Sequence, residues 1–176
     1  GVVSQRLDEL SKILRRGSST QSQKTPDVSL NEIISETIAL LDARLQSIEL
    51  SLALCDIPKL EAQRSHLSVV VSNLLSNAVD ALDGEKNLSR RIHVESGERR
   101  EAGRNWVYIR VEDNGPGVSL ELREKVFEEF FTTKSRDAGT GIGLTLCRDI
   151  VREHRGDLRI RSSEVLKGAC FEMILP

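Results

Sequence analysis

Apolar residues recur at helical spacing along several stretches of the chain. The longest stretch covers about residues 63–82, with apolar side chains at Leu67, Val70, Val71, Leu74, Leu75, Ala78, Ala81 and Leu82. Such a continuous stripe predicts a long helix with one buried face. The same criterion predicts helices over about residues 30–45, with Ser29 or Asn31 as the N-cap, and over about residues 141–154.

Apolar residues alternate with smaller or polar residues over residues 48–54, 92–96 and 106–112, which predicts β-strands with one buried face. Two closing strands are expected over residues 158–160 and 169–175. The second and third should form an antiparallel hairpin across a polar connection, so the sheet should be mixed. The order of elements predicts an α/β fold, a two-layer sandwich of a mixed sheet and about three helices.

The amino-terminal part of the chain has its own pattern. Residues 1–16 carry a helical stripe, which predicts a short amphipathic helix formed around Val3, Leu7, Leu10 and Leu14. Residues 17–25 are polar and precede Pro26, as is typical of a linker. We therefore expect the main domain to span residues 26–176.

Composition and charge narrow the possible function classes. Of the 176 residues, 39% are hydrophobic and 30% are charged, as in ordinary soluble globular domains. The net charge of −2 gives no case for nucleic-acid binding. There is no apolar run long enough for a membrane span and no signal-peptide pattern. Three dispersed cysteines fit a reducing cytoplasm and predict neither disulfides nor a zinc site.

Asp113 is the first candidate functional residue. Strand periodicity places it on the same face as the buried residues Val107, Ile109 and Val111. A carboxylate on that face is costly unless it receives hydrogen bonds. Gly115 and the later Gly117 would let a flat ligand approach the backbone. The alternative is a simple turn in which the aspartate accepts a local hydrogen bond.

Two asparagines form the second candidate. Asn73 and Asn77 lie four residues apart on the long helix, with Asn77 at the margin of its apolar stripe. An amide oxygen there can ligate a hard cation such as Mg²⁺. The alternative is two solvated asparagines. Asp80, on the same side, is interpreted as a solvent-facing charge.

The loop before the last predicted helix has two further features. Three phenylalanines crowd into residues 127–131, which predicts a hydrophobic cluster that pins the loop. Lys134 follows in a polar stretch and could reach a terminal phosphate, although most surface lysines have no specific role. Residues 139–144, Gly-Thr-Gly-Ile-Gly-Leu, open the helix and suit an anion site. Their spacing matches neither the Rossmann fingerprint nor the P-loop.

Taken in order, these motifs resemble the nucleotide-binding domain of sensor histidine kinases, within the ATPase/kinase group that includes gyrase B and MutL. Residues 73–81 resemble the asparagine box, and residues 113–117 match the first glycine box. Residues 127–134 resemble the phenylalanine box, and residues 139–144 the second glycine box. The resemblance covers about residues 26–176 and implies a Bergerat-type ATP-binding fold.

The resemblance assigns roles to these residues. Asp113 would accept a hydrogen bond from the adenine amino group, and Asn77 would bind Mg²⁺ that bridges the triphosphate. The implied catalytic residues are Asn73, Asn77 and Lys134. The implied nucleotide-binding residues are Asn77, Asp113, Gly115, Gly117, Lys134, Gly139, Thr140, Gly141, Ile142, Gly143 and Leu144. Residues 132–140 would form an ATP lid.

The resemblance also implies which reaction follows. Gyrase-like ATPases have a water-activating glutamate at the position of Asn73, and an asparagine cannot act as a base. This favours phosphoryl transfer to a protein over hydrolysis. His66, His93 and His154 are not followed by an acidic residue, as the family's phosphoacceptor is, and we interpret them as structural or surface residues.

The implied acceptor is a histidine on a separate helical dimerisation domain, of which residues 1–16 would be the end. A response regulator receiver domain would then take the phosphate. The full-length protein would be a homodimer, this fragment alone a monomer, and its location cytoplasmic with or without a membrane anchor elsewhere. Two alternatives are a serine kinase of the anti-sigma type and a degenerate nucleotide-sensing module.

Overall fold

The computed structural model describes residues 25–83, 89–101, 103–132 and 141–176. The predicted helix over residues 1–16 and most of the predicted linker lie outside these ranges. So do three predicted site residues, namely Lys134, Gly139 and Thr140.

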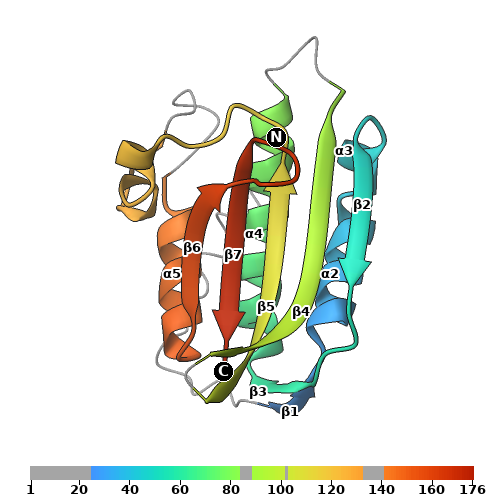
Figure 1. Cartoon of the computed structure of the whole chain (residues 1–176), viewed down its shortest axis with the longest axis vertical. Helices are drawn as coiled ribbons and strands as arrows, with labels where there is room; N and C mark the ends of the chain where they lie inside the picture. Colours follow the sequence, from blue (N-terminus) through green and yellow to red (C-terminus); the bar gives the residue numbers. More distant parts are fainter. Residues whose placement is uncertain (1–24, 84–88, 102, 133–140) are drawn as a thin grey trace.

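One five-stranded sheet forms the front layer of the molecule (Figure 1). Its strand order is β2-β4-β5-β7-β6, with β2 parallel to β4 and the other neighbours antiparallel. The strands are β2 (Glu49–Leu54), β4 (Arg91–Glu101), β5 (Arg104–Asp113), β6 (Asp157–Ser162) and β7 (Ala169–Leu175). The predicted mixed sheet and its hairpin are confirmed.

The β4–β5 hairpin is longer than the sequence predicts. Residues 97–105 were expected to be a polar connection, but pairing continues to Glu101 and Arg104. Gly97 lies inside β4 because the ring of Tyr108 covers it, and a Cβ there would be 2.6 Å from the tyrosine hydroxyl. A glycine in a strand commonly marks such a close approach. Local sequence shows the glycine but not the ring above it.

Helices cover one face of the sheet (Figure 1). They are α2 (Leu30–Leu40), the one-turn α3 (Asp42–Leu45), α4 (Arg64–Leu82) and α5 (Gly143–Glu153). The Ser29 hydroxyl caps α2 by accepting from the Glu32 N–H at 3.3 Å. The helix expected over residues 30–45 is interrupted at Leu41. Three longer helices packed on the five-stranded sheet confirm the two-layer α/β sandwich.

The core lies between the helices and the sheet. Leu74 and Leu75 of α4 pack there with Ile92, Ile109 and Met173 from three strands, all at most 1% exposed. Burial of such a side chain contributes about 1.5–3 kcal/mol. The stripe and the strand alternation therefore predicted the right faces of α4, β4 and β5, whereas β7 is buried on both faces.

Three features of the fold differ from the sequence pattern. β2 is an edge strand, so the predicted buried face is wrong for Leu52, which is 50% exposed. A small second sheet of β1 (Thr25–Val28) and β3 (Leu60–Ala62) was not predicted, because such short segments carry no readable period. Asp80 does not simply face solvent, since it pairs with Arg44 of α3 at 2.5 Å.

Two histidines join the first turn of α4 to the last turn of α5. The Nε2 atom of buried His154 accepts from the Gln63 backbone N–H at 3.1 Å, and its Nδ1 lies 2.8 Å from the Ile150 carbonyl oxygen. These contacts assign the neutral tautomer with the proton on Nδ1. The His66 ring packs edge-on to it, with centroids 6.1 Å apart. Both histidines are structural, as predicted.

The environment of His66 makes folding stability pH-dependent. Burial lowers the pKa of His66 below its usual 6.5 and His154 adds to this effect, while Glu153, 3.7 Å from Nδ1, opposes it. The unfolded chain therefore takes up a proton near pH 6.5 that the folded state does not bind. Acidification through this range should lower the free energy of unfolding, and His66→Gln should remove that part of the decrease.

Denaturant titrations at about pH 7.5 and about pH 5.5 check this expectation. Glu153→Gln is the matched control, because it removes the opposing carboxylate and should retain or steepen the pH dependence. If the free energy of unfolding depended on pH identically in wild type and His66→Gln, the assigned role of His66 would be contradicted.

Candidate functional site

Segments far apart in the sequence meet at one end of the sheet. β5 ends there with Asp113, the loop between β6 and β7 (residues 163–168, the β6–β7 loop) lies beside it, and α5 begins there (Figure 1). The carboxyl-terminal half of α4, with Asn73 and Asn77, runs alongside the amino end of α5. Most of the predicted site residues are therefore brought together.

Asp113 is 1% exposed and lies on the core face, as predicted. Its Oδ1 accepts from the Gly115 N–H at 2.9 Å and from the Ala169 N–H at 3.3 Å. Its Oδ2 is buried and has no hydrogen-bond partner among the described residues. A buried acceptor without a partner is costly, so this oxygen suits a ligand that supplies a donor.

Burial raises the pKa of Asp113 above its usual 3.8. The two backbone N–H donors of Gly115 and Ala169 oppose this shift, and the nearby charge of Glu112 adds to it. The simple-turn alternative explains only the Gly115 contact. The second donor and the unpartnered Oδ2 favour a binding site.

Glycines surround Asp113 because side chains would not fit. A Cβ on Gly115 would lie 3.0 Å from the Asp113 Oδ1 and 3.2 Å from the Ala81 carbonyl oxygen. Gly117 has a φ of +72°, which favours glycine. A Cβ on Gly168 would lie 2.5 Å from the same Oδ1 and 2.8 Å from the Gly115 nitrogen.

Gly168 and Ala169 are site residues that sequence reasoning missed. Sequence reasoning gave Gly168 no role at the site, yet its N–H donates to the Asp113 carbonyl oxygen at 3.1 Å. Asn114 was also missed. Its Oδ1 accepts from the Arg91 N–H at 2.7 Å and its Nδ2 donates to the Ser89 carbonyl at 2.6 Å, which ties the loop after β5 to the start of β4.

Asn73 joins α4 to the first turn of α5. Its Nδ2 lies 3.1 Å from the Cys147 Sγ, and a Cβ on Gly143 would lie 2.6 Å from the same Nδ2. Gly143 therefore allows α5 to approach α4 closely. Asn77, one turn further along α4, is half-buried. Its amide oxygen is a donor type that suits Mg²⁺ together with phosphate oxygens and water.

The amino end of α5 offers backbone donors. Gly141 has a φ of +66°, and its carbonyl accepts from the Phe130 N–H at 3.0 Å. Ile142 is the N-cap and makes no side-chain capping hydrogen bond. Ile142 thus offers no side-chain cap to the first N–H groups of this 11-residue helix, from Gly143 and Leu144, and such groups together with the helix dipole suit an anion.

The predicted phenylalanine cluster is only partly correct. Phe127 is 5% exposed, with the Arg148 guanidinium 4.4 Å from its ring centroid. The Thr145 hydroxyl donates to the Phe127 carbonyl at 3.0 Å and so links this segment to α5. Phe130, however, is 70% exposed; its backbone has a φ of +64°, and its N–H donates to the Gly141 carbonyl.

The sequence of the chain matches the model of a known protein family. The family model described as "Histidine kinase-, DNA gyrase B-, and HSP90-like ATPase" matches residues 62–176. The match spans both asparagines, Asp113 and the start of α5. The chain belongs to this family.

Individual relatives narrow the class to a sensor histidine kinase catalytic domain. The signal transduction histidine-protein kinase AtoS of Escherichia coli is 34% identical over 184 residues, covering 99% of this chain and 28% of AtoS. The nucleotide-free catalytic domain of histidine kinase ThkA superposes with a TM-score of 0.74 and 30% identity, covering 88% of this chain and 95% of that one. The predicted family, fold and enzyme class are confirmed.

A further neighbour is ThkA in complex with the response regulator protein TrrA. It has a TM-score of 0.75 and 27% identity, and the match covers 98% of this chain and 47% of the ThkA chain. The chain thus spans about a quarter of AtoS and about half of ThkA.

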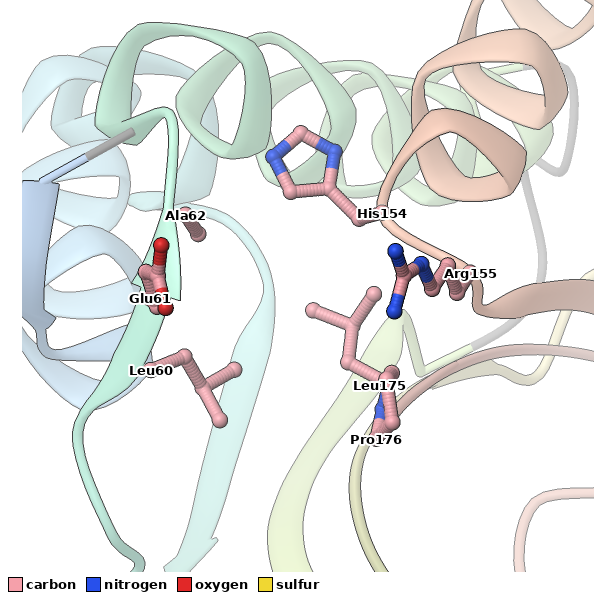
Figure 2. A pocket seen from close by; sticks show the side chains of 7 residues that line it. All are labelled: Leu60, Glu61, Ala62, His154, Arg155, Leu175 and Pro176. Atoms are coloured by element: carbon pink, nitrogen blue, oxygen red, sulfur yellow. The ribbon is translucent and has the colours of Figure 1, made fainter. Parts of the chain in front are cut away.

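The kinase domain also has a cavity at the opposite end of the sheet, where β7 ends (Figure 2). Its volume is about 280 Å³. Both ring nitrogens of His154 are committed to backbone groups there. The residues that line it include none of the predicted site residues: Leu60, Glu61, Ala62, His154, Arg155, Leu175 and Pro176. The cavity is therefore separate from the Asp113 site.

Three further findings concern the residues that the structure describes. No helix in it combines the length and the apolar character that a membrane span needs. No group of three or more His, Cys, Asp or Glu side chains in it could hold a metal. All three cysteines lie in the described ranges and are free thiols.

Proposed function

We propose that this domain binds Mg-ATP and transfers the γ-phosphate to a histidine on a separate dimerisation domain of the same protein, for relay to a response regulator. The observation that carries the proposal is the buried Oδ2 of Asp113, which has no hydrogen-bond partner among the described residues and lies within a cradle of glycines. This arrangement suits a flat ligand with an amino group, which is what adenine offers.

The other residues fit the rest of the nucleotide. Gly115 and Gly117 leave space for the ring, and the amino end of α5 supplies N–H donors and a helix dipole for the phosphates. The Asn77 amide oxygen would hold Mg²⁺, which neutralises charge on the phosphates when bound. Lys134, Gly139 and Thr140 belong to the proposal through the family resemblance alone, since they lie outside the described residues.

The chemistry of Asn73 supports a protein acceptor. It is an amide in contact with Cys147 and Gly143, so it cannot take a proton from water. Of the three histidines, His66 and His154 are packed between helices, and the Nδ1 atom of His93 on β4 lies 2.8 Å from the Ser51 hydroxyl oxygen. None of the three is followed by an acidic residue. The acceptor would therefore lie on another domain, and a full-length homodimer would bring the two together. ATP as the substrate and free cysteines fit a cytoplasmic location.

Phosphotransfer from γ-labelled ATP to a supplied helical dimerisation domain tests the function. We expect label on the histidine of that domain, released by acid as phosphohistidine is. Acid-stable label on serine would favour the anti-sigma type of kinase instead. Nucleotide binding without transfer to any supplied partner would favour a sensing module.

We expect Asn77→Ala to lose the magnesium-dependent part of ATP affinity. Without the amide oxygen, the metal loses its one protein ligand in the proposal, and the Kd for Mg-ATP should rise about 10-fold or more. Calorimetry with Mg²⁺ and with EDTA measures this difference. Asn105→Ala, an exposed residue near the hairpin turn, is the matched control and should bind as wild type does. Equal affinities of Asn77→Ala and wild type in Mg²⁺ would contradict the assignment.

A further inference from the structure

A buried hydrogen bond ties the β6–β7 loop to the residue next to Asp113. Ser163 is 3% exposed and Glu112 is 4% exposed, and the Ser163 hydroxyl donates to the Glu112 Oε2. The same hydroxyl oxygen accepts from the Leu166 backbone N–H at 2.7 Å. Ser163 therefore uses its donor and an acceptor lone pair to join β5 to the loop.

The loop that Ser163 holds also contacts Asp113. The Ser163 N–H donates to the Gly168 carbonyl at 2.8 Å, and the Lys167 N–H donates to the Ser163 carbonyl at 3.2 Å, which closes the loop on itself. From its end, the Gly168 N–H reaches the Asp113 carbonyl and the Ala169 N–H reaches the Asp113 Oδ1. A shift of the loop would move both donors.

Glu112 and Asp113 act on opposite faces of the same strand. Consecutive residues of a strand project to opposite faces, and Glu112 lies opposite Cys170 on the face away from the helices. Asp113 projects toward the core. The bond to Ser163 thus holds the loop from one face, while the loop orients the Asp113 carboxylate from the other. Because the acceptor is a buried carboxylate, loss of its donor is costly.

We propose that Glu112 and Ser163 are positioning residues for adenine recognition, acting through the β6–β7 loop on the direction of the Asp113 carboxylate. The proposal rests on the proposed ATP site and adds a determinant of base selectivity that does not touch the nucleotide. Without the serine hydroxyl, the Leu166 N–H and Glu112 Oε2 lose their partner. The loop then loses its side-chain hydrogen bond to β5 and keeps only the backbone contacts of Gly168 and Ala169 with Asp113, so Oδ1 of Asp113 is held less firmly.

Calorimetry with ADP and inosine diphosphate measures this effect, because the two bases differ at the amino group that Asp113 would recognise. We expect Ser163→Ala to weaken ADP binding about 10-fold and to change inosine diphosphate binding little, so that selectivity falls. Ser163→Thr keeps the hydroxyl and should retain the ADP affinity and the base selectivity of wild type. Ser162→Ala is the matched control, since Ser162 only accepts an exposed bond from Arg123 at 2.7 Å.

Amide NMR shifts of Gly115 and Ala169 provide a second readout that needs no nucleotide. Both N–H groups donate to Asp113 Oδ1, so we expect their shifts to change in Ser163→Ala and to stay as in wild type in Ser162→Ala. If Ser163→Ala does not fold, Glu112→Gln replaces it. This variant keeps one acceptor oxygen but not the charge, and should show a smaller change of the same kind.

The outcomes separate the two proposals. Unchanged shifts, or a lowered melting temperature with an unchanged ratio of ADP to inosine diphosphate affinity, would overturn the positioning role and leave the ATP site intact. If wild type binds no ADP, the proposed function fails, and the amide shifts alone decide whether the loop positions Asp113.

Discussion

Asp113→Asn should abolish selective adenine nucleotide binding without destabilising the domain. The asparagine Oδ1 can still accept from the Gly115 and Ala169 N–H groups, but an NH₂ group replaces the unpartnered Oδ2. Its donor would then face the donor of the adenine amino group. We expect the Kd for ADP to rise about 100-fold or more, as for a lost hydrogen bond to a charged group plus an unpaired buried donor.

Although Asp113→Asn should weaken ADP binding, it should leave the thermal stability of the nucleotide-free domain unchanged or raise it. The folded-state pKa of Asp113 is raised by burial, so ionisation of this carboxyl is less favourable in the folded than in the unfolded chain. Its contribution to stability is fully present below pH 3.8 and is lost as pH rises through the folded-state pKa. Asp113→Asn removes this loss, so the nucleotide-free variant should unfold at the same or a higher temperature than wild type at neutral pH.

Calorimetry with ADP and thermal unfolding without nucleotide check both parts. Asp157→Asn is the matched control, because this carboxylate pairs with Arg159 on the surface and should leave ADP binding unchanged. ADP affinity retained in Asp113→Asn would remove the basis of the proposed site.

Gly168→Ala should destabilise the domain and abolish nucleotide binding together. The added Cβ would meet the Asp113 carbonyl oxygen, with the Asp113 Oδ1 at 2.5 Å and the Gly115 nitrogen at 2.8 Å. Two of these three atoms belong to the backbone, so the β6–β7 loop would have to move away from β5. We expect a loss of about 2–4 kcal/mol in the free energy of unfolding.

Urea titrations and ADP calorimetry measure the effect, with Gly103→Ala as the matched control. Gly103 lies in the β4–β5 turn at a φ of +79°, and a Cβ there would meet nothing within 4 Å. Its substitution should cost only about 1 kcal/mol through backbone strain and should leave ADP binding intact. If Gly168→Ala and Gly103→Ala changed the free energy of unfolding and the ADP affinity equally, the contact of residue 168 with Asp113 would not be the cause.

The motifs that carry the site were readable because each depends on short-range chemistry. Asp113 could be placed on the core face from the alternation of its own strand, and the amino end of α5 from its glycines. The exposed Phe130 shows the limit of such reasoning. Its neighbour Phe127 is buried against Arg148, while Phe130, whose N–H donates to the Gly141 carbonyl, is exposed. Two similar residues in one motif thus have different environments.

By itself, the sequence determined the long helix α4, the alternating strands and the position of Asp113 at the end of one of them. These features follow from a period of apolar residues that matches the geometry of a helix or a strand, and such a match is local. Only the tertiary structure decided what surrounds the carboxylate. Ala169 lies 56 residues from Asp113, and Ser163 lies 51 residues from Glu112. Which strands become neighbours, and in which register, is set by packing of the whole sheet against its helices, and no local period encodes it.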